Sequence, residues 1–152
     1  MTKDIEVEMF TRLFAILGTA TALQMQLQVG SANIRGPGFR AFSAMLDAQR
    51  LNAAKTITEI IDAIRVKGAH IPKSPDKLLQ HTHIDIEDDV PVSEKECIAF
   101  FHDQQKLMTG AITMAMNFAR TKNYETIMTA LVECMRRHER DFFELRALKV
   151  LP

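Results

Sequence analysis

Four long stretches of this chain carry apolar side chains at steps of three and four residues, and this pattern limits the folds open to it. Such steps place the apolar residues on one face of an α-helix, which must then be buried against another element. No stretch alternates with a period of two, so we expect no β-sheet. The stripes are Met9, Leu13, Ile16, Ala20, Leu23 and Leu27; Phe39, Phe42, Leu46, Ala53, Ile57, Ile60 and Ile64; Cys97, Phe101, Met108, Ala111, Ala115 and Phe118; and Ile127, Leu131, Cys134, His138, Phe142 and Leu145.

Residues that start or stop helices stand between the stripes. The Gly-Pro-Gly run at residues 36–38 disfavours a helix interior and separates the first two predicted helices. Gly68 indicates the end of the second helix. Ser93 with Glu96 forms a capping-box pattern at the start of the third, and Asn123 is predicted to cap the last.

The connections between the predicted helices have unequal lengths, and this favours one topology. Short links join the first helix to the second and the third to the fourth, so each pair is antiparallel. A much longer stretch, Gly68 to Val92, joins the second to the third and should contain structure of its own. There Ser74 followed by Pro75 predicts a short helix. Two hairpins joined by one long crossover make an all-α, ferritin-like four-helix bundle.

Size and charge narrow the function classes. With 152 residues and 47% hydrophobic residues, we expect a single domain over residues 1–152. Lysine plus arginine equals aspartate plus glutamate at 19 each, which weighs against DNA binding through a surplus of cations. The local cluster of Arg136, Arg137 and Arg140 is interpreted as a solvated helix face. The absence of a signal-peptide pattern and of long apolar runs predicts a cytoplasmic protein without membrane spans.

Two cysteines and one histidine of the stripes have alternative interpretations. Cys97 and Cys134 are predicted to be reduced thiols, with a disulfide as the less favoured alternative. His138 is interpreted as a hydrogen-bonded core histidine rather than a ligand, because no third or fourth donor accompanies it and Cys134. No Glu-x-x-His motif occurs in the chain, so we expect no metal centre inside the bundle.

Residues 31–39, which read SANIRGPGF, resemble the signature of the Dps family at the junction of its first two helices. The stretches around Asp47, around Asp62 and from Asn123 to Leu148 continue the similarity over most of the chain. The resemblance implies a ferritin-like bundle with a short crossover helix, assembled as a dodecameric shell. It also implies iron as the bound metal and, as family activity, oxidation of Fe(II) to Fe(III).

The resemblance carries over poorly to the iron ligands. The family holds iron between two subunits with two histidines, two aspartates and a glutamate, and the matching positions here are Ser31, Ser43, Asp47, Thr58 and Asp62. Only Asp47 is identical, and Asp62 is a shortened substitute. An iron pair needs several imidazole and carboxylate donors. We therefore expect at most weak cation binding at Asp47 and Asp62, and no catalytic residue.

The crossover holds the densest group of other potential ligands. If that segment is extended, His81, His83, Asp85 and Glu87 project to one side. This arrangement predicts a surface metal site, against the alternative of a polar crossover with solvated charges.

Three functions follow from these observations. The first is an iron-binding or iron-storing shell with a degenerate ferroxidase centre, which forms a homo-oligomer or assembles with an active relative. The second is a non-enzymatic assembly protein that retains only the fold. The third is DNA protection, which the neutral charge places last.

Overall fold

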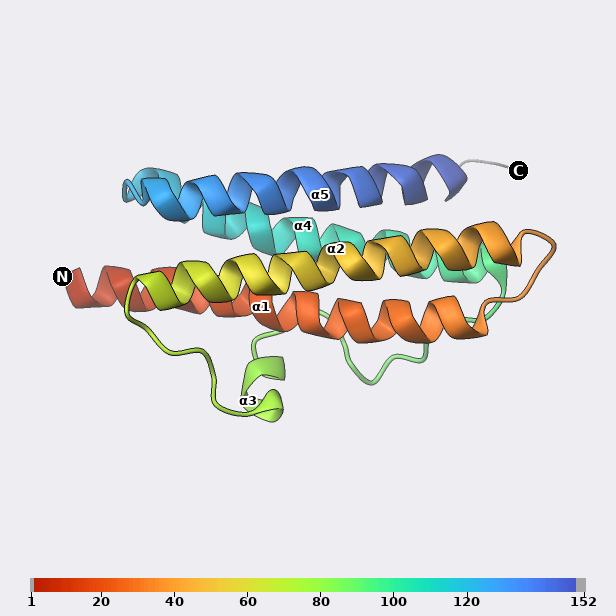
Figure 1. The fold of residues 1–152 in the computed structure, drawn as a ribbon, viewed down its shortest axis with the longest axis horizontal. Helices are drawn as coiled ribbons and strands as arrows, with labels where there is room; N and C mark the ends of the chain where they lie inside the picture. Colours follow the sequence, from red (N-terminus) through yellow and green to blue (C-terminus); the bar gives the residue numbers. More distant parts are fainter. Residues whose placement is uncertain (1, 150–152) are drawn as a thin grey trace.

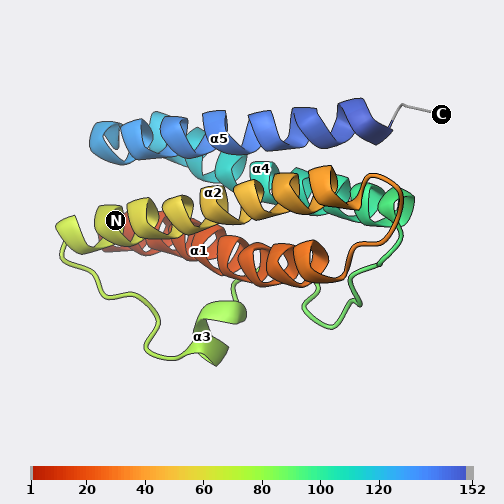
Figure 2. The same cartoon turned by 45° about the vertical axis from the view of Figure 1, so that its right-hand side comes forward.

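The computed structural model describes residues 2–149, and within that range its regular structure is helical. Four long helices lie side by side, and a short fifth lies outside them against the first (Figures 1 and 2). None of the described helices is both long and apolar enough to span a bilayer. The helices are α1 (Thr2–Asn33), α2 (Phe39–Val66), α3 (Pro75–Leu79), α4 (Glu94–Thr121) and α5 (Glu125–Lys149).

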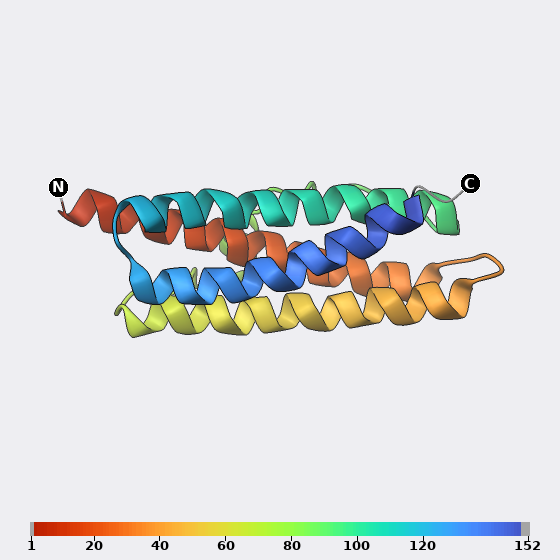
Figure 3. The same ribbon diagram turned by 90° about the horizontal axis from the view of Figure 1, so that it is seen from above.

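The order of the helices confirms the predicted ferritin-like topology. Helices α1 and α2 form one antiparallel pair, and α4 and α5 form the other (Figures 1 and 3). Helices α2 and α4 run in the same direction, so the segment between them must return along the length of the bundle. This geometric requirement explains why the crossover is long and why it carries the short helix α3.

The apolar stripes form the core, as predicted. All six stripe residues of α1 are 0% exposed, and burying a leucine or isoleucine contributes roughly 1.5–3 kcal/mol. Phe42, Ile57 and Phe118 are only partly buried, and the ends of two stripes differ more clearly from the expectation. Phe39 is 48% exposed at the first turn of α2, and on α5 Asp141 is buried at 3% exposure where Phe142 is only partly buried.

The Gly-Pro-Gly junction is fastened to the start of α4. The Arg35 N–H donates to the Val92 carbonyl at 2.7 Å, and the Glu94 N–H donates to the Arg35 carbonyl at 3.1 Å. The Glu94 carboxylate also accepts from the Gly38 N–H. Gly36 has φ +147°, and a Cβ there would lie 2.3 Å from the Glu94 side chain, so the junction requires glycine at this position.

The crossover lies directly against α1. Ser74 caps α3 by accepting the Lys77 N–H at 3.2 Å, as predicted. A Cβ on Gly18 would lie 2.6 Å from the Leu78 carbonyl oxygen, so the backbones approach closely there. The His83 N–H donates to the Thr19 hydroxyl at 3.0 Å. The segment after α3 folds in turns rather than as an extended strand. The extended conformation that would place His81, His83 and Asp85 on one side is therefore not found.

The link between α4 and α5 corrects another prediction. Asn123 does not cap α5, because the helix begins at Glu125 and Tyr124 occupies the position before it. Asn123 instead adopts a φ of 60° in the turn, a left-handed conformation that asparagine tolerates better than most residues. Asn123 thus separates α4 from α5, as predicted, but it does so through its backbone conformation in the turn and not as a helix cap.

We predict that Gly36→Ala lowers the free energy of unfolding by about 1–3 kcal/mol, because the substitution meets both an unfavourable φ and the Glu94 side chain. Gly110→Ala is the matched control: it lies in α4, and its Cβ would meet nothing within 4 Å. It should stabilise the protein by about 0.5–1 kcal/mol. Urea unfolding of both variants measures the difference, and equal effects would contradict this account of the junction.

Candidate functional site

The ends of α1 and α2 bring Ser31 and Ser43 together. Their hydroxyl oxygens lie 3.0 Å apart. The Ser31 hydroxyl also lies 3.0 Å from the Ser43 carbonyl, and the Ser43 hydroxyl donates to the Ser31 carbonyl at 2.8 Å. The two positions at which the resembled family has histidine ligands are therefore adjacent. Their serine hydroxyls form hydrogen bonds with each other and with the backbone.

Asp47 follows Ser43 by one helical turn on α2, and with Ser31 and Ser43 it makes up one half of the site that the resemblance implies. Its carboxylate accepts from the Arg50 side chain, with Nε at 2.9 Å and a second guanidinium nitrogen at 2.8 Å. Both side chains are partly exposed, at 27% for Arg50 and 51% for Asp47, so the pair contributes little to stability. It does neutralise the one carboxylate that this half of the site has kept.

Thr58 and Asp62 make up the other half of the site that the resemblance implies, and they lie further along α2. Both are exposed, and the Thr58 hydroxyl donates to the Ala54 carbonyl at 3.2 Å. At 1.5 Å of rise per residue, Thr58 lies about 16 Å from Asp47 along the helix. One chain therefore cannot bring the two halves to a single ion, and a shared site requires a second copy of the chain.

The crossover residues point in different directions. The His81 ring packs on Phe14 with 5.4 Å between ring centroids, and the Asp85 carboxylate accepts from the Glu87 N–H at 3.0 Å. Over the described residues 2–149, no group of three or more histidine, cysteine, aspartate or glutamate side chains is placed to hold a metal ion. A loop site at His81, His83 and Asp85 stays a prediction.

Inside the bundle, polar side chains of α2, α4 and α5 form a continuous hydrogen-bonded chain that the sequence analysis did not foresee. His138 is 0% exposed and lies 3.1 Å through Nδ1 from the Gln105 amide oxygen and 2.7 Å through Nε2 from the Thr56 hydroxyl. Because an amide oxygen only accepts, Nδ1 carries the proton and Thr56 donates to Nε2. His138 is thus a core histidine, as predicted.

The chain continues from His138 in both directions with one donor–acceptor polarity. Arg137 donates to the Thr56 hydroxyl at 3.0 Å and pairs with Glu59 at 2.7 Å. At the other end the Gln105 amide donates to the Gln49 oxygen at 3.2 Å, and Gln49 in turn lies 3.4 Å from the Asp141 carbonyl. Each member has a partner, so this buried network is compatible with a stable core.

Burial shifts the pKa of two titratable groups of this network in opposite directions. It lowers the pKa of His138 to about 3, and the positive charge of Arg137 adds to that effect. It raises the pKa of Asp141 to about 7, although Asn52 donates to both carboxylate oxygens at 2.9 and 3.1 Å. Near neutral pH the histidine is therefore uncharged and the carboxyl group is partly protonated.

Both cysteines are free, buried thiols, which agrees with the favoured interpretation. Burial raises the pKa of Cys97 to about 11 and that of Cys134 to about 12, the latter with help from the negative charge of Glu59. The Cys134 thiol donates to Glu59 at 3.4 Å. Both groups remain protonated at neutral pH, so neither is a ready nucleophile or metal ligand.

The arginine cluster of α5 is compensated by glutamates. Arg136 lies 3.7 Å from Glu133, Arg140 lies 4.0 Å from Glu144, and Arg137 is paired with Glu59. Arg136 and Arg140 are 77% and 83% exposed, which agrees with a solvated helix face, whereas Arg137 is only 15% exposed and belongs to the buried chain, contrary to the expectation. The three pairings leave little unbalanced charge for phosphates.

Comparison with solved structures identifies the architecture. The chain superposes on Dps from Thermosynechococcus elongatus with a TM-score of 0.92 at 12% identity, covering 99% of this chain and 96% of that one. Dps from Vibrio cholerae, described as a ferritin-like diiron-carboxylate protein, superposes with a TM-score of 0.87 at 16% identity, covering 95% of this chain and 91% of that one. A dodecameric thioferritin from Bacteroides fragilis superposes with a TM-score of 0.86 at 12% identity, covering 97% of this chain and 92% of that one. No protein-family model and no curated protein sequence matches.

The protein is a ferritin-like four-helix bundle. Within that class it has the Dps fold, in which a crossover with a short helix, here α3, joins the two hairpins. At these identities the likeness establishes the fold alone, and the chemistry has to be argued from the residues at the site.

We predict that Asp141→Asn stabilises the protein increasingly as pH rises. The folded-state pKa of Asp141, about 7 against an ordinary 3.8, means that the folded state binds more protons between these values. The stability contributed by the neutral carboxyl group is full below pH 3.8 and is lost as pH rises through 7. The advantage of the variant should grow from pH 4 to pH 7 and then level off, by a few kcal/mol at most.

His138 has the opposite sign, because its lowered pKa removes stability as pH falls from 6.5 towards 3. The wild-type protein alone would therefore show partial cancellation, which is why the difference between variant and wild type is the quantity to measure. Urea unfolding at a fixed protein concentration across pH 4–8 gives this difference. If the difference in the free energy of unfolding between variant and wild type does not change with pH, the pH dependence does not come from Asp141.

Proposed function

We propose that this chain forms a hollow shell of the Dps kind that takes up and holds iron without oxidising it at the inter-subunit site. The observation that carries the proposal is the mutual hydrogen bonding of Ser31 and Ser43 where the family resemblance implies histidines. The shell keeps the architecture that encloses a mineral but lacks the donors that would drive rapid oxidation.

The chemistry of the donors supports an inactive centre. Ferrous iron prefers imidazole and carboxylate ligands, and serine or threonine hydroxyls neither neutralise its charge nor bind it tightly at neutral pH. In this chain Ser31 and Ser43 already satisfy each other, and the Asp47 carboxylate is paired with Arg50. An iron ion would have to break these contacts and would gain in return the carboxylate of Asp47 and, from a second copy, that of Asp62.

The outer surface of α1 and α2 supports assembly with a second copy. Met25 and Val29 are 59% and 45% exposed on α1, close to Ser31, and Leu51 is 51% exposed on α2. Ala44, Ala48 and Leu51 recur at helical spacing with Thr58 and Asp62 on one face of α2. An exposed apolar face of this kind favours a partner surface, and a two-fold related copy would bring Asp62 towards Asp47.

The proposal that the shell holds iron is supported by proteins that share its fold. One structural neighbour is described as a diiron-carboxylate protein and another as a dodecameric thioferritin. The proposal takes the shell and the metal from these relatives and departs from them in the oxidation step. Iron would therefore enter the shell as Fe(II) and lose its electron slowly to dissolved O2 without help from the protein, or it would be oxidised by an active relative in a mixed shell.

We predict that the wild-type protein oxidises Fe(II) in air no faster than buffer does, while iron still co-elutes with the assembled shell. Absorbance of the ferric product gives the rate, and metal analysis of the shell fraction gives the retained iron. Oxidation well above the buffer rate would contradict the proposal. No retained iron would leave the protein as an assembly protein that keeps only the fold.

A restored ligand set tests the same argument in the opposite direction. The combined variant Ser31→His, Ser43→His, Thr58→Asp and Asp62→Glu, with native Asp47, should oxidise Fe(II) at least tenfold faster than wild type. The matched control carries Ser31→Gln and Ser43→Gln with the same other changes, because glutamine has a similar length but is a poor iron ligand. Equal rates for both variants would show that the halves of the site do not meet.

A further inference from the structure

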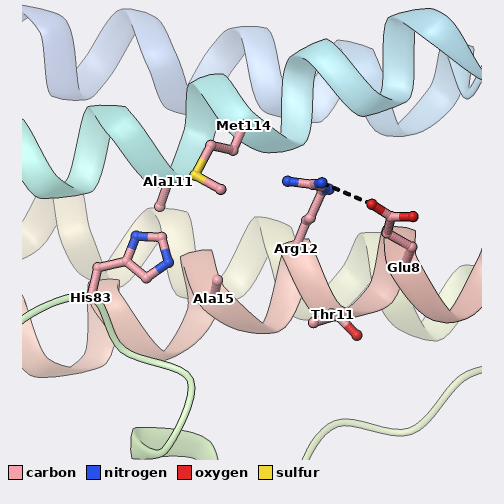
Figure 4. Close-up of a pocket in the computed structure, with 7 residues that line it drawn as sticks. All are labelled: Glu8, Thr11, Arg12, Ala15, His83, Ala111 and Met114. Carbon is pink, nitrogen blue, oxygen red and sulfur yellow. Dashed lines mark hydrogen bonds and ion pairs between the residues drawn. The ribbon is translucent and has the colours of Figure 1, made fainter.

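A pocket of about 270 Å³ opens between α1, α4 and the crossover, and its lining includes none of Ser31, Ser43, Asp47, Thr58 and Asp62. Glu8 and Arg12 stand at one end, His83 stands at the other, and Ala15, Ala111 and Met114 lie between them (Figure 4). The pocket combines an apolar middle with a cation at one end, and this is the pattern of sites that bind small amphipathic ligands.

Arg12 is held in a fixed orientation at its end of the pocket. Its guanidinium carbon lies 5.2 Å from the centroid of the Phe118 ring, and one terminal nitrogen donates to Glu8 at 2.8 Å. The side chain is 29% exposed, so most of it is already ordered against the protein. A guanidinium that is packed on an aromatic ring loses little further freedom when it binds a ligand.

The hydrogen bonding of Arg12 is incomplete. Its Nε is buried and finds no acceptor among the residues that the structure describes. Because Nε is buried, a ligand in the pocket can reach only the two terminal nitrogens, and this edge of a guanidinium also binds a carboxylate with two parallel hydrogen bonds. The Glu8 carboxylate uses one of these nitrogens, and the other points towards the middle of the pocket (Figure 4), so the two-point site is half used by the protein itself.

Glu8 is a weak competitor for that site. Its side chain is 51% exposed, and its contact with Arg12 joins residues one turn apart on the surface of α1. Such pairs contribute at most about 1 kcal/mol, so an incoming anion can displace Glu8 at small cost. The apolar surface of Ala15, Ala111 and Met114 would then cover the rest of the ligand.

The volume limits the size of the ligand. At about 270 Å³ the pocket lies just below the roughly 300–1,000 Å³ of sites for drug-sized molecules. A polymer or a nucleotide is therefore too large, while inorganic phosphate would leave the apolar part empty. A small carboxylate with an aliphatic or aromatic body matches both the charge and the shape.

We propose that this pocket binds a small organic carboxylate, with its carboxylate group on the two terminal nitrogens of Arg12 and its apolar body between Ala15 and Met114. This site is independent of the proposed iron chemistry, because none of its residues belongs to the inter-subunit positions. Glu8 acts as an internal competitor that sets how tightly the carboxylate binds.

Titration calorimetry of the assembled protein with octanoate tests the proposal, and octan-1-ol serves as the uncharged probe of the same length. We expect one octanoate per subunit and at least tenfold weaker binding of the alcohol. Arg12→Gln should weaken octanoate binding at least tenfold. Glu8→Gln should strengthen it severalfold because the competing carboxylate is removed, an effect that loss of structure would not produce. Arg120→Gln, on the exposed surface of α4, is the matched control and should bind like wild type.

The proposal is overturned if the alcohol binds as well as octanoate, since the pocket would then recognise only apolar surface. It is equally overturned if Glu8→Gln leaves the affinity unchanged or lowers it. Binding that Arg12→Gln and Arg120→Gln weaken to the same extent would indicate general charge attraction rather than a defined site.

Discussion

The structure depends on one constraint: four apolar helix faces have to be buried together while α2 and α4 run in the same direction. The first condition makes the bundle, and the second makes the long crossover (Figure 3). The crossover is held against α1, because α3 packs closely on Gly18 and the His83 N–H donates to the Thr19 hydroxyl. His83 of this fastened crossover closes one end of the pocket of Arg12.

The interior of the bundle has an apolar part and a polar part. The stripe of α1 is wholly apolar, whereas α2, α4 and α5 share the hydrogen-bonded chain from Arg137 through Thr56 and His138 to Gln105. A chain with complementary donors and acceptors fixes the register of the three helices more strictly than apolar contacts do. It also fills the interior with groups that are poor metal ligands, since His138 uses both ring nitrogens for hydrogen bonds.

The sequence predicted the helices, the crossover helix and the topology, because periodicity and helix-breaking residues are local signals. It did not predict the buried chain, because a period shows which face of a helix is buried but not which residue lies opposite. Asp141 illustrates the limit: its charge placed it outside the predicted stripe, and only Asn52, distant in sequence, explains its burial. The conformation of the crossover was missed for a related reason, since turns replace the extended segment that we expected around His81, His83 and Asp85. The adjacency of Ser31 and Ser43 was implied by the family resemblance and not by any local pattern.

The account of function rests on the idea that hydroxyls cannot replace imidazoles at a centre that has to hold two iron ions. Diffraction from crystals of the assembled shell soaked in ferrous salt, measured at the iron absorption edge, tests this idea directly. The account predicts no pair of iron ions between Ser31, Ser43 and Asp47 of one copy and Asp62 of another. Two well-occupied ions bridged at that boundary would contradict it and would make the protein an oxidase with unfamiliar ligands.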